Sequence, residues 1–357
     1  MLSRIRGVRI SGLASVVPSG VITIEEEASL FGNDVTRMER FKRDIGIRKR
    51  HITLKEECTS DLCEHAARFL LTKLSYGRTD IDCLVMVTQT PDYFQPATSH
   101  VLHGRLGFGE DCAALDINLG CSGYIYGLWI ASLMVSAGNC KKVMLLAGDT
   151  MSRCVSPYDR AVKPLFGDAG SATIIESSSD DRAMTFVLHS DGLGYQHLII
   201  PAGAFRKRPS VETAKIIEGE DGNLRSDEHL YMNGAEIFNF SIKEVPSLIE
   251  EVLAVSAWKK EDVDYFIFHQ ANKFIIQNIA RRLRIPIEKA PYDVFEKYGN
   301  QSSASIPVSI CEDLSPVVKD KAIKTILAGF GTGLSWAACA LSLGPMDCYP
   351  VIILDGN

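Results

Sequence analysis

The stretch "TDIDCLVMVTQT", residues 79–90, has a second copy later in the chain, and this repetition decides the fold. The later copy is "EDVDYFIFHQAN", residues 261–272. In both, an Asp-apolar-Asp step leads into a short apolar run and then into polar residues. The distance from Asp80 to Asp262 is 182 positions. Each segment is typical of a short buried strand, and their likeness raises the question of whether more of the chain repeats.

A second pair of segments repeats at nearly the same distance. In "KKVMLLAGDT" (141–150) and "IKTILAGFGTG" (323–333), a basic residue leads into an apolar run that ends in Ala-Gly. Gly148 and Gly329 are 181 positions apart. Chance rarely gives two matches at nearly one offset, so we expect the chain to be a duplicated unit.

Helical patterns lie between the predicted strands. The segments "SDLCEHAARFLLTKL" (60–74) and "SIKEVPSLIEEVLAVS" (241–256) repeat apolar residues with the period of a helix. Strands that alternate with helices form parallel sheets covered on both faces. We therefore expect an α/β fold with two halves, residues 1–178 and 179–357. Because sites in such sheets gather at the carboxyl ends of strands, both halves would contribute to one cleft.

The polar stretch at residues 206–228, "RKRPSVETAKIIEGEDGNLRSDE", does not follow this pattern. It contains glycine and proline and has no extended apolar run. We expect a surface excursion within the second half, and a lid over a tunnel is one role open to it.

The composition limits the classes of protein to which the chain can belong. Of its 357 residues, 46% are hydrophobic and 23% are charged, which allows a sizeable core and argues against global disorder. The formal net charge of -6 disfavours nucleic acid or an anionic membrane as the main partner. The longest apolar stretch, residues 123–137, is too short for a bilayer, so we expect no membrane span.

The ten cysteines do not form a metal or redox motif. No C-x-x-C pair occurs, and the eight histidines do not cluster beside the cysteines, so we expect no metal site. Arginines interrupt the first apolar residues, and we identify no signal peptide. Many cysteines without a secretion signal favour the reducing cytoplasm.

Cys121 lies in "NLGCSGYIYGLW" (118–129), before an unusually apolar helical pattern. If the preceding strand ends near Asn118, the cysteine lies at the turn into the helix. Free backbone N–H groups and the helix dipole at that place lower the pKa of a thiol. Gly120 and Gly123 permit a tight turn and the close approach of a substrate. Cys121 is therefore a candidate nucleophile, and a small thiol in the core is the alternative.

Two further candidates come from the second half. His269 ends its apolar run, where a buried parallel strand would place a site, and a hydrogen-bonded core histidine is the alternative. Asn300 lies in a Gly-Asn turn that suits a side chain held by the backbone, and an ordinary turn residue is the alternative. Adding the offset of 182 to Cys121 gives Ser303, in the same turn as Asn300. The duplication therefore predicts that the three candidates converge.

The glycines of "AGFGTGLSW" (328–336) form a fourth element of the predicted site. Their backbone N–H groups are suited to an oxyanion. Phosphate binding is less favoured, because the chain lacks both a G-x-G-x-x-G and a P-loop sequence. No G-x-S-x-G elbow occurs either, which argues against an α/β-hydrolase.

With these residues in view, the chain resembles the thiolase-fold condensing enzymes, and most closely the 3-oxoacyl-[acyl-carrier-protein] synthase III family. The resemblance covers about residues 8–343. It rests on "GCSGY" (120–124), "FGDAGSA" (166–172), "HQAN" (269–272), "YGNQSSASIP" (298–307), "GFGTGLSWAA" (329–338) and the early segment "GIRKRH" (46–51). It implies a thiolase-like fold, in which two duplicated α/β halves form a five-layered α-β-α-β-α arrangement, and it implies a homodimer.

The resemblance also implies a decarboxylative Claisen condensation without a cofactor. Cys121 would take the acyl group of an acyl-CoA, with the backbone N–H groups of Cys121 and Thr332 as the oxyanion hole. His269 and Asn300 would then donate hydrogen bonds to the thioester carbonyl of malonyl-ACP, the malonyl-loaded acyl carrier protein, and stabilise the enolate as carbon dioxide leaves. Two neutral donors suit an enolate because no base is needed when carbon dioxide departs, so we expect a neutral His269.

The residues that would bind the primer depart from the family pattern. A Trp and an Arg that commonly hold the CoA adenine fall at Arg40 and Asp44, and an aromatic that closes the acyl pocket across the dimer falls near Gln95. Arg160 still matches a CoA-contacting arginine. We therefore expect an intact catalytic set with an unusual acyl donor or a specialised pathway.

The partner and the reaction leave alternatives open. Lys273, Arg281 and Arg282 would form a basic helix face for an acidic carrier protein, and a solvated face is the alternative. An acyltransferase of the same fold would move the acyl group to an alcohol or amine without decarboxylation. A non-catalytic partner subunit of a related synthase is a third possibility, against which the set of Cys121, His269 and Asn300 argues.

Overall fold

Two β-sheets form the centre of the protein, whose computed structural model describes residues 1–179 and 181–354. The seven-stranded sheet has the order β17-β2-β8-β7-β5-β6, with β18 also paired to β2, and the five-stranded sheet has the order β1-β9-β16-β15-β14. The first sheet contains β2 (Val8–Val17), β5 (Cys83–Val87), β6 (Ala113–Ile117), β7 (Lys142–Asp149), β8 (Ala169–Ser177), β17 (Asp347–Cys348) and β18 (Ile352–Ile353). The second contains β1 (Leu2–Ile5), β9 (Met184–Ser190), β14 (Tyr265–Phe268), β15 (Ile323–Gly331) and β16 (Ser335–Leu343).

Four strands of each sheet repeat one pattern. In the first sheet β5 is parallel to β7, while β7 and β8, and then β8 and β2, are antiparallel. In the second sheet β14 is parallel to β15, while β15 and β16, and then β16 and β9, are antiparallel. The first pair of repeated segments contains β5 and β14, and the second pair contains β7 and β15. The predicted duplication of an α/β unit is therefore confirmed.

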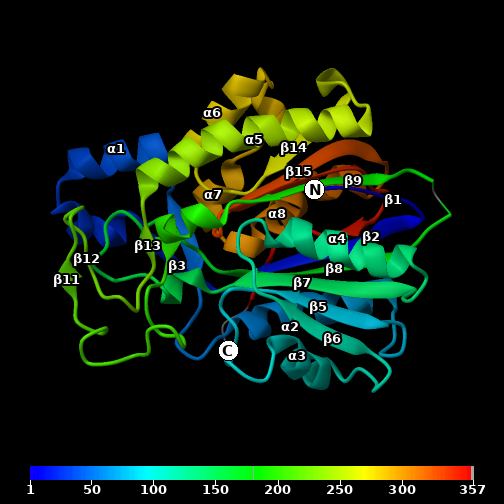
Figure 1. Cartoon of the computed structure of the whole chain (residues 1–357), viewed down its shortest axis with the longest axis horizontal. Helices are drawn as coiled ribbons and strands as arrows, with labels where there is room; N and C mark the ends of the chain where they lie inside the picture. The colour runs from blue at the N-terminus through cyan, green and yellow to red at the C-terminus, as the bar shows by residue number, and fades with distance from the viewer. Residues whose placement is uncertain (180, 355–357) are drawn as a thin grey trace.

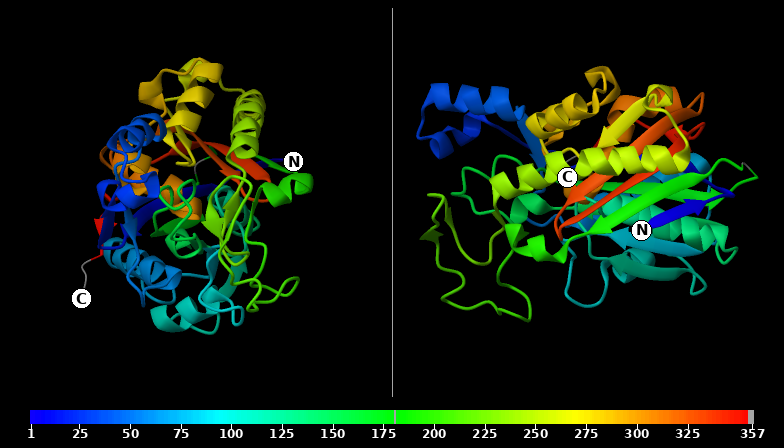
Figure 2. Two further views of the ribbon diagram at one scale, coloured as in Figure 1. Left: turned by 90° about the vertical axis from the view of Figure 1, so that its left-hand side faces the viewer. Right: turned by 45° about the horizontal axis from the view of Figure 1, so that its top comes forward.

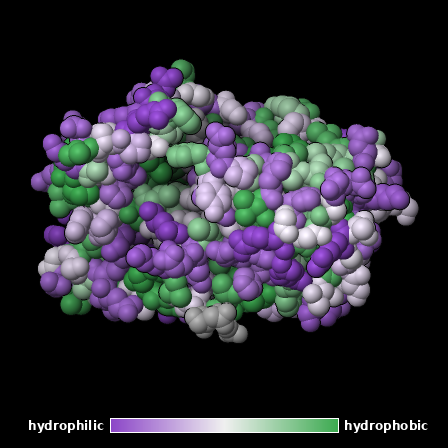
Figure 3. Space-filling view, turned by 90° about the horizontal axis from the view of Figure 1, so that it is seen from below, coloured by the Kyte–Doolittle hydropathy of each residue, from purple (hydrophilic) through white to green (hydrophobic). Residues whose placement is uncertain are grey.

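Helices complete five layers, α-β-α-β-α, which follow one another from top to bottom in Figure 1 and are seen from other sides in Figure 2. Helices α5 (Gly234–Ser256) and α6 (Lys273–Leu283) cover the outer face of the five-stranded sheet. Helices α4 (Gly123–Ser136) and α8 (Ser305–Ser309) lie between the sheets. Helices α2 (Thr59–Leu74) and α3 (Thr98–Leu106) cover the outer face of the seven-stranded sheet. Polar and apolar residues are interspersed on the face seen from below (Figure 3).

Strand β5 shows why these strands read as continuous apolar runs. Cys83, Val85 and Val87 point into the core between the sheets, and Leu84 and Met86 point into the core under α2 and α3. A strand with helices on both faces has no polar face, so its sequence does not alternate.

The two ends of the chain cross between the halves. Strand β1, at the amino end, pairs with β9 in the five-stranded sheet, and the carboxyl-terminal β17 and β18 pair with β2 in the seven-stranded sheet. Between β8 and β9 the chain passes from the seven-stranded sheet to the five-stranded sheet. We therefore propose that the two sets of repeated strands divide near residue 178, and that each terminal segment pairs with the sheet of the other half. Residues 355–357 of the second half lie outside the described residues.

Smaller elements surround one end of the sheets. They are α1 (Val35–Ile45), α7 (Asp293–Tyr298) and the two-stranded pairs β3 (Gly20–Thr23) with β4 (Lys49–Ile52), β10 (Leu198–Ile199) with β13 (Tyr231–Met232), and β11 (Ile217–Glu218) with β12 (Leu224–Arg225). Helix α9 (Ser315–Val318) instead continues the helical segment that begins with α8. The stretch 206–228 is largely exposed, as expected of a surface excursion. Arg225 ties it to the body by an ion pair of 2.8 Å with the buried Asp159.

Candidate active site

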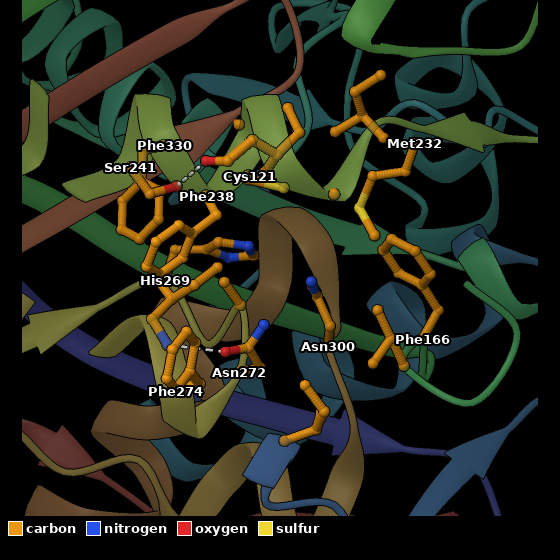
Figure 4. A pocket seen from close by; sticks show the side chains of 18 of the residues that line it. Cys121, Phe166, Met232, Phe238, Ser241, His269, Asn272, Phe274, Asn300 and Phe330 are labelled. Carbon is orange, nitrogen blue, oxygen red and sulfur yellow. Dashed lines mark hydrogen bonds between the residues drawn. The ribbon is translucent and has the colours of Figure 1, made fainter. Parts of the chain in front are cut away.

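A cavity of about 330 Å³ opens at the carboxyl ends of the strands, and Cys121, His269 and Asn300 all line it. Among the described residues no charged side chain lines this cavity. Its walls are mainly apolar and include Phe41, Ile45, Leu165, Phe166, Leu198, Met232, Ile237, Phe238, Phe274, Ile275 and Phe330. Figure 4 shows the three polar side chains facing the same space, between Phe238 and Phe274 on one side and Phe166 and Met232 on the other. The structure thus brings together the candidates that the sequence places 179 positions apart from first to last.

Cys121 lies in the turn between β6 and α4, two residues before the helix begins. The side chain is only 7% exposed, and the backbone of Thr332 and the hydroxyl of Ser302 hydrogen-bond the sulfur. Glycine is required opposite it, because a Cβ on Gly331 would lie 2.8 Å from Sγ of Cys121. The turn itself needs Gly120, where a Cβ would overlap the side chain of Gln89. These contacts hold the sulfur at the inner end of the cavity.

The expectation of a thiol with a lowered pKa is wrong for the unliganded site. Burial, with a smaller contribution from the charge of Asp149, raises the pKa of the Cys121 thiol to about 12. The hydrogen bonds from Ser302 and Thr332 oppose this shift without overcoming it. The physical reason is that loss of hydration penalises the thiolate more strongly than the nearby helix terminus stabilises it.

His269 follows directly after β14, and its imidazole is 2% exposed. Its Nδ1 lies 2.7 Å from the hydroxyl of Ser305, and its ring meets that of Phe330 edge to face at 5.6 Å. Burial lowers the pKa of His269 to about 3, against a smaller opposing effect of the Ser302 backbone. The imidazole is therefore neutral at physiological pH, as the sequence predicted.

Asn300 is held by the turn in which it lies. Its Oδ1 accepts a hydrogen bond of 2.9 Å from the backbone N–H of Ser302, which leaves the amide NH₂ as the free end. Gly299 before it has φ of 79°, a backbone conformation that favours glycine. Figure 4 shows the amide nitrogen of Asn300 directed into the cavity. The site therefore offers two neutral N–H donors, from Asn300 and His269, near one thiol.

One buried carboxylate beside the site was not among the candidate residues predicted from the sequence. Asp149, at the end of β7, is completely buried and accepts hydrogen bonds from the backbone N–H of Gln89 at 2.7 Å and of Ser303 at 3.1 Å. It thereby ties the first half to the turn that contains Asn300. The signal was available, because the first half has Asp149 after Ala-Gly where the second half has Phe330.

The residues expected to bind the primer lie outside the cavity lining. Arg40 is exposed on α1 and pairs with Asp44 at 3.5 Å, and Arg160 is also exposed. Each is next to a lining residue in the chain, Phe41 or Ala161. Gln95 lies in the loop after β5, and the cavity lining includes no residue of that loop. Residues 206–228 do not contribute to the lining either, so the structure gives no support to a lid role for them.

The three cations expected to meet a carrier protein are spread along α6. Lys273 is at the beginning of the helix, beside the lining residue Asn272, with its amino group 5.7 Å from the ring centre of Tyr292. Arg281 and Arg282 are exposed at the other end of α6, about 12 Å further along the helix axis. Arg282 donates a hydrogen bond of 2.9 Å to the backbone carbonyl of Ile242. Only Lys273 is next to the cavity.

Two features are absent from residues 1–179 and 181–354. No group of three or more histidine, cysteine or acidic side chains is placed to hold a metal ion. No helix in this part of the chain is long and apolar enough to cross a membrane.

Comparison with known proteins places this geometry in a family. The profiles of 3-oxoacyl-[acyl-carrier-protein] synthase III and of its C-terminal part match residues 115–192 and 253–343. A Campylobacter jejuni protein, provisionally named 3-oxoacyl-[acyl-carrier-protein] synthase 3, is 37% identical over 357 residues, which cover 99% of this chain and 98% of that protein. The chain belongs to the 3-oxoacyl-[acyl-carrier-protein] synthase III family. Its members include a Clostridium perfringens synthase III that is 35% identical over 86% of this chain and 91% of its own.

Solved structures agree with this synthase III assignment. A 3-oxoacyl-(acyl-carrier protein) synthase from Burkholderia xenovorans superposes with a TM-score of 0.93 at 38% identity and covers 99% of both chains. The priming β-ketosynthase of the R1128 polyketide pathway superposes with a TM-score of 0.80 at 26% identity, over 95% of this chain and 97% of its own. The thiolase-like fold expected from the sequence motifs is thereby confirmed.

Proposed function

We propose that this synthase catalyses the decarboxylative Claisen condensation of an acyl-CoA primer with malonyl-ACP and releases 3-oxoacyl-ACP for fatty acid or related biosynthesis. One observation carries the proposal: a thiol and two neutral N–H donors, contributed by the two duplicated halves, line one apolar cavity. In enzyme classes this reaction is an acyl transfer, because the acyl group passes from CoA to the enzyme and then to the malonyl carbon.

The first half-reaction loads Cys121. The sulfur attacks the thioester carbonyl of the acyl-CoA, and the backbone N–H groups of Cys121 and Thr332 stabilise the oxyanion. The departing CoA thiolate takes the proton that Cys121 gives up, so the exchange of one thioester for another creates no net charge. This balance suits a thiol whose pKa burial raises, because the thiolate need exist only during the transfer.

The second half-reaction uses His269 and Asn300. Both donate hydrogen bonds to the thioester carbonyl of malonyl-ACP, and the enolate forms as the bond to the carboxylate breaks and carbon dioxide leaves. The enolate carbon attacks the acyl-cysteine, and Cys121 departs as a thiolate that is reprotonated from solvent. No step needs a metal or prosthetic group; acyl-CoA and malonyl-ACP are substrates.

Carbon dioxide release tests this proposal against its alternatives. Enzyme supplied with an acyl-CoA and carboxyl-labelled malonyl-ACP should release labelled carbon dioxide and form 3-oxoacyl-ACP in equal amounts. His269→Ala and Asn300→Ala should lose both products while Cys121 still becomes acylated. Acyl transfer to an alcohol or amine without carbon dioxide would favour the acyltransferase alternative. Protein that never gains acyl mass would favour a non-catalytic partner subunit.

The partners follow from the same geometry. The acyl carrier protein would dock with its acidic surface near Lys273, at the cavity, with Arg281 and Arg282 further along α6. Arg160 and Arg40 would approach the phosphates of CoA at the entrance, and a change of either residue should raise the KM for acyl-CoA without lowering kcat.

The ten free cysteines favour the cytoplasm as the compartment.

We also propose a homodimer. Strand β6 ends the strand order of its sheet, and an edge strand of this kind pairs readily with another chain. Phe94, beside Gln95, is 77% exposed on the loop after β5 and would be buried by such an arrangement. Light scattering that gives the mass of a single chain at micromolar concentration would contradict this part of the proposal.

A further inference from the structure

Ser305 is the first residue of α8, and its hydroxyl is the nearest hydrogen-bonding side chain to the imidazole of His269. Both residues are buried, with exposed fractions of 0% and 2%. The distance between Oγ of Ser305 and Nδ1 of His269 is 2.7 Å. A serine here has no role in the bond-making steps proposed above, because it does not line the cavity. Its contact with His269 therefore needs an explanation of its own.

The chemistry of a neutral imidazole gives this contact a consequence. A neutral ring carries its single proton on one nitrogen and accepts a hydrogen bond at the other. The condensation requires a proton on the nitrogen that faces the substrate. If Nδ1 accepts the hydroxyl proton of Ser305, the ring proton is on Nε2. If Nδ1 carries the proton, Nε2 becomes an acceptor and cannot stabilise an enolate oxygen.

Few groups contact the imidazole of His269 and can decide which of its nitrogens carries the proton. Burial keeps the pKa of His269 at about 3, so a doubly protonated ring does not remove the distinction between the nitrogens. The backbone of Ser302 also hydrogen-bonds the ring. A backbone acceptor favours a protonated nitrogen, so Ser302 and Ser305 are the groups in contact with the ring that can influence the tautomer.

We propose that Ser305 is a positioning residue that donates its hydroxyl proton to Nδ1 of His269 and thereby fixes the tautomer with the proton on Nε2, facing the substrate carbonyl. The inference rests on the proposed condensation for its kinetic consequence, but the tautomer itself is a property of the unliganded protein. The same turn fixes the other donor, since Oδ1 of Asn300 is held by Ser302. Residues 300–305 would thus orient both groups that stabilise the enolate.

The tautomer is measured by nitrogen-15 NMR of protein labelled at histidine, with His269→Gln used to assign the resonances. We expect an unprotonated Nδ1 and a protonated Nε2 in the wild-type protein, and a shift of the proton toward Nδ1 in Ser305→Ala. A protonated Nδ1 in the wild-type protein, or the same tautomer in both proteins, would overturn the inference. This readout stands whether or not the enzyme condenses malonyl-ACP.

Kinetics give the second readout. In Ser305→Ala the kcat for carbon dioxide release should fall about 10- to 100-fold, the range seen when groups that orient metal-binding histidines are removed, with the KM for malonyl-ACP unchanged. Acylation of Cys121 should persist, and Ser305→Thr, which restores a hydroxyl, should recover most of the rate. Equal loss in Ser305→Ala and Ser305→Thr would indicate a packing role instead.

Ser309→Ala is the matched control. Ser309 is a completely buried serine one turn further along α8, and its hydroxyl donates a hydrogen bond of 2.9 Å to Asp313. This variant should lower the melting temperature without changing the His269 tautomer or kcat. A wild-type protein that releases no carbon dioxide with any primer would refute the proposed function, while the NMR result would still decide the tautomer.

Discussion

The duplicated halves place two equivalent turns beside one another, and only one of them carries the proposed nucleophile. Cys121 and its counterpart Ser303 are 182 positions apart, and each precedes a helix of the central layer, α4 or α8. Cys121 lines the cavity and is 7% exposed, whereas Ser303 is 1% exposed and is not among the lining residues. Equivalent backbone positions therefore have different access to substrate.

The residues opposite the two turns explain this difference. Each turn packs against the end of a strand from the other half: a Cβ on Gly331 of β15 would meet Cys121, and Asp149 of β7 accepts the N–H of Ser303. Gly331 has no side chain to fill the space beside the sulfur, whereas the carboxylate of Asp149 binds the backbone of the second turn. The comparison teaches that two equivalent positions differ in their access to the cavity, and that the residues opposite them differ as well.

The largest effect is expected when the nucleophile is moved between the turns. Cys121→Ala should lower the rate of self-acylation by a factor on the order of 10⁴ or more, with the fold intact, as intact mass and circular dichroism would show. The double variant Cys121→Ala/Ser303→Cys should not recover it, because the side chain at 303 has no access to the cavity. Cys140→Ala, at a half-buried cysteine, is the control and should be acylated normally. Labelling that persists in Cys121→Ala would refute the assignment of the nucleophile.

The space opposite the thiol is tested by Gly331→Ala. The added methyl group would lie 2.8 Å from Sγ of Cys121, and either the sulfur or β15 must shift. A displacement of this size should slow acylation about 100-fold in stopped-flow measurements with acyl-CoA. Gly104→Ala is the control, since a Cβ there meets no atom within 4 Å. Acylation at the wild-type rate in Gly331→Ala would show that the glycine is not needed for access.

The carboxylate opposite the second turn is tested by Asp149→Asn. Its charge contributes to the raised pKa of Cys121, so its removal should lower that pKa and extend alkylation of Cys121 by iodoacetamide to lower pH. Asp168→Asn is a matched control, because Asp168 is an equally buried carboxylate that accepts hydrogen bonds from Thr53 and Ser152. Both variants should lose stability, but only Asp149→Asn should shift the pH profile. An unshifted profile would remove Asp149 from the account of the thiol.

The smallest effect concerns pH and stability. The pKa of His269 is about 3 in the folded protein against an ordinary value of 6.5, so the unfolded state binds more protons between these values. This contribution is fully present above pH 6.5 and is lost as the pH falls toward 3. As the pH falls from about 7.5 to 5.5, this effect should lower the free energy of unfolding by about 1 kcal/mol and the melting temperature by a few degrees. His269→Gln should lose less stability than the wild-type protein over this interval; equal losses would contradict a buried neutral imidazole.

Much of the fold was predictable because the repeated strands carry a strong pattern. The segments 60–74 and 241–256 lie within α2 and α5, and the repeated segments contain β5, β14, β7 and β15. The crossing of the termini was not predictable in the same way. Strands β17 and β18 have two residues each, which is too short for any periodicity, and their pairing depends on contacts distant in sequence.

The site was predictable in its position more than in its electrostatics. The offset between halves placed Asn300 near Cys121, and the end of a predicted buried strand selected His269. The helix terminus is visible in the sequence near Cys121, but the burial that dominates its pKa depends on residues distant in sequence, among them Gly331. The roles of Arg40, Gln95 and Arg160 stay predictions, because exposed side chains leave no packing pattern from which a ligand can be inferred.

The most direct test of the account is a single turnover of the acylated enzyme. Protein acylated at Cys121 and freed of acyl-CoA is mixed with malonyl-ACP, and intact mass spectrometry follows both proteins over time. We predict that the acyl mass leaves Cys121 as the carrier protein loses carbon dioxide and gains the acyl group, and that His269→Ala and Asn300→Ala hold the acyl group without turnover. Transfer at an unchanged rate in those variants, or acyl mass on a residue other than Cys121, would contradict a site built from both halves.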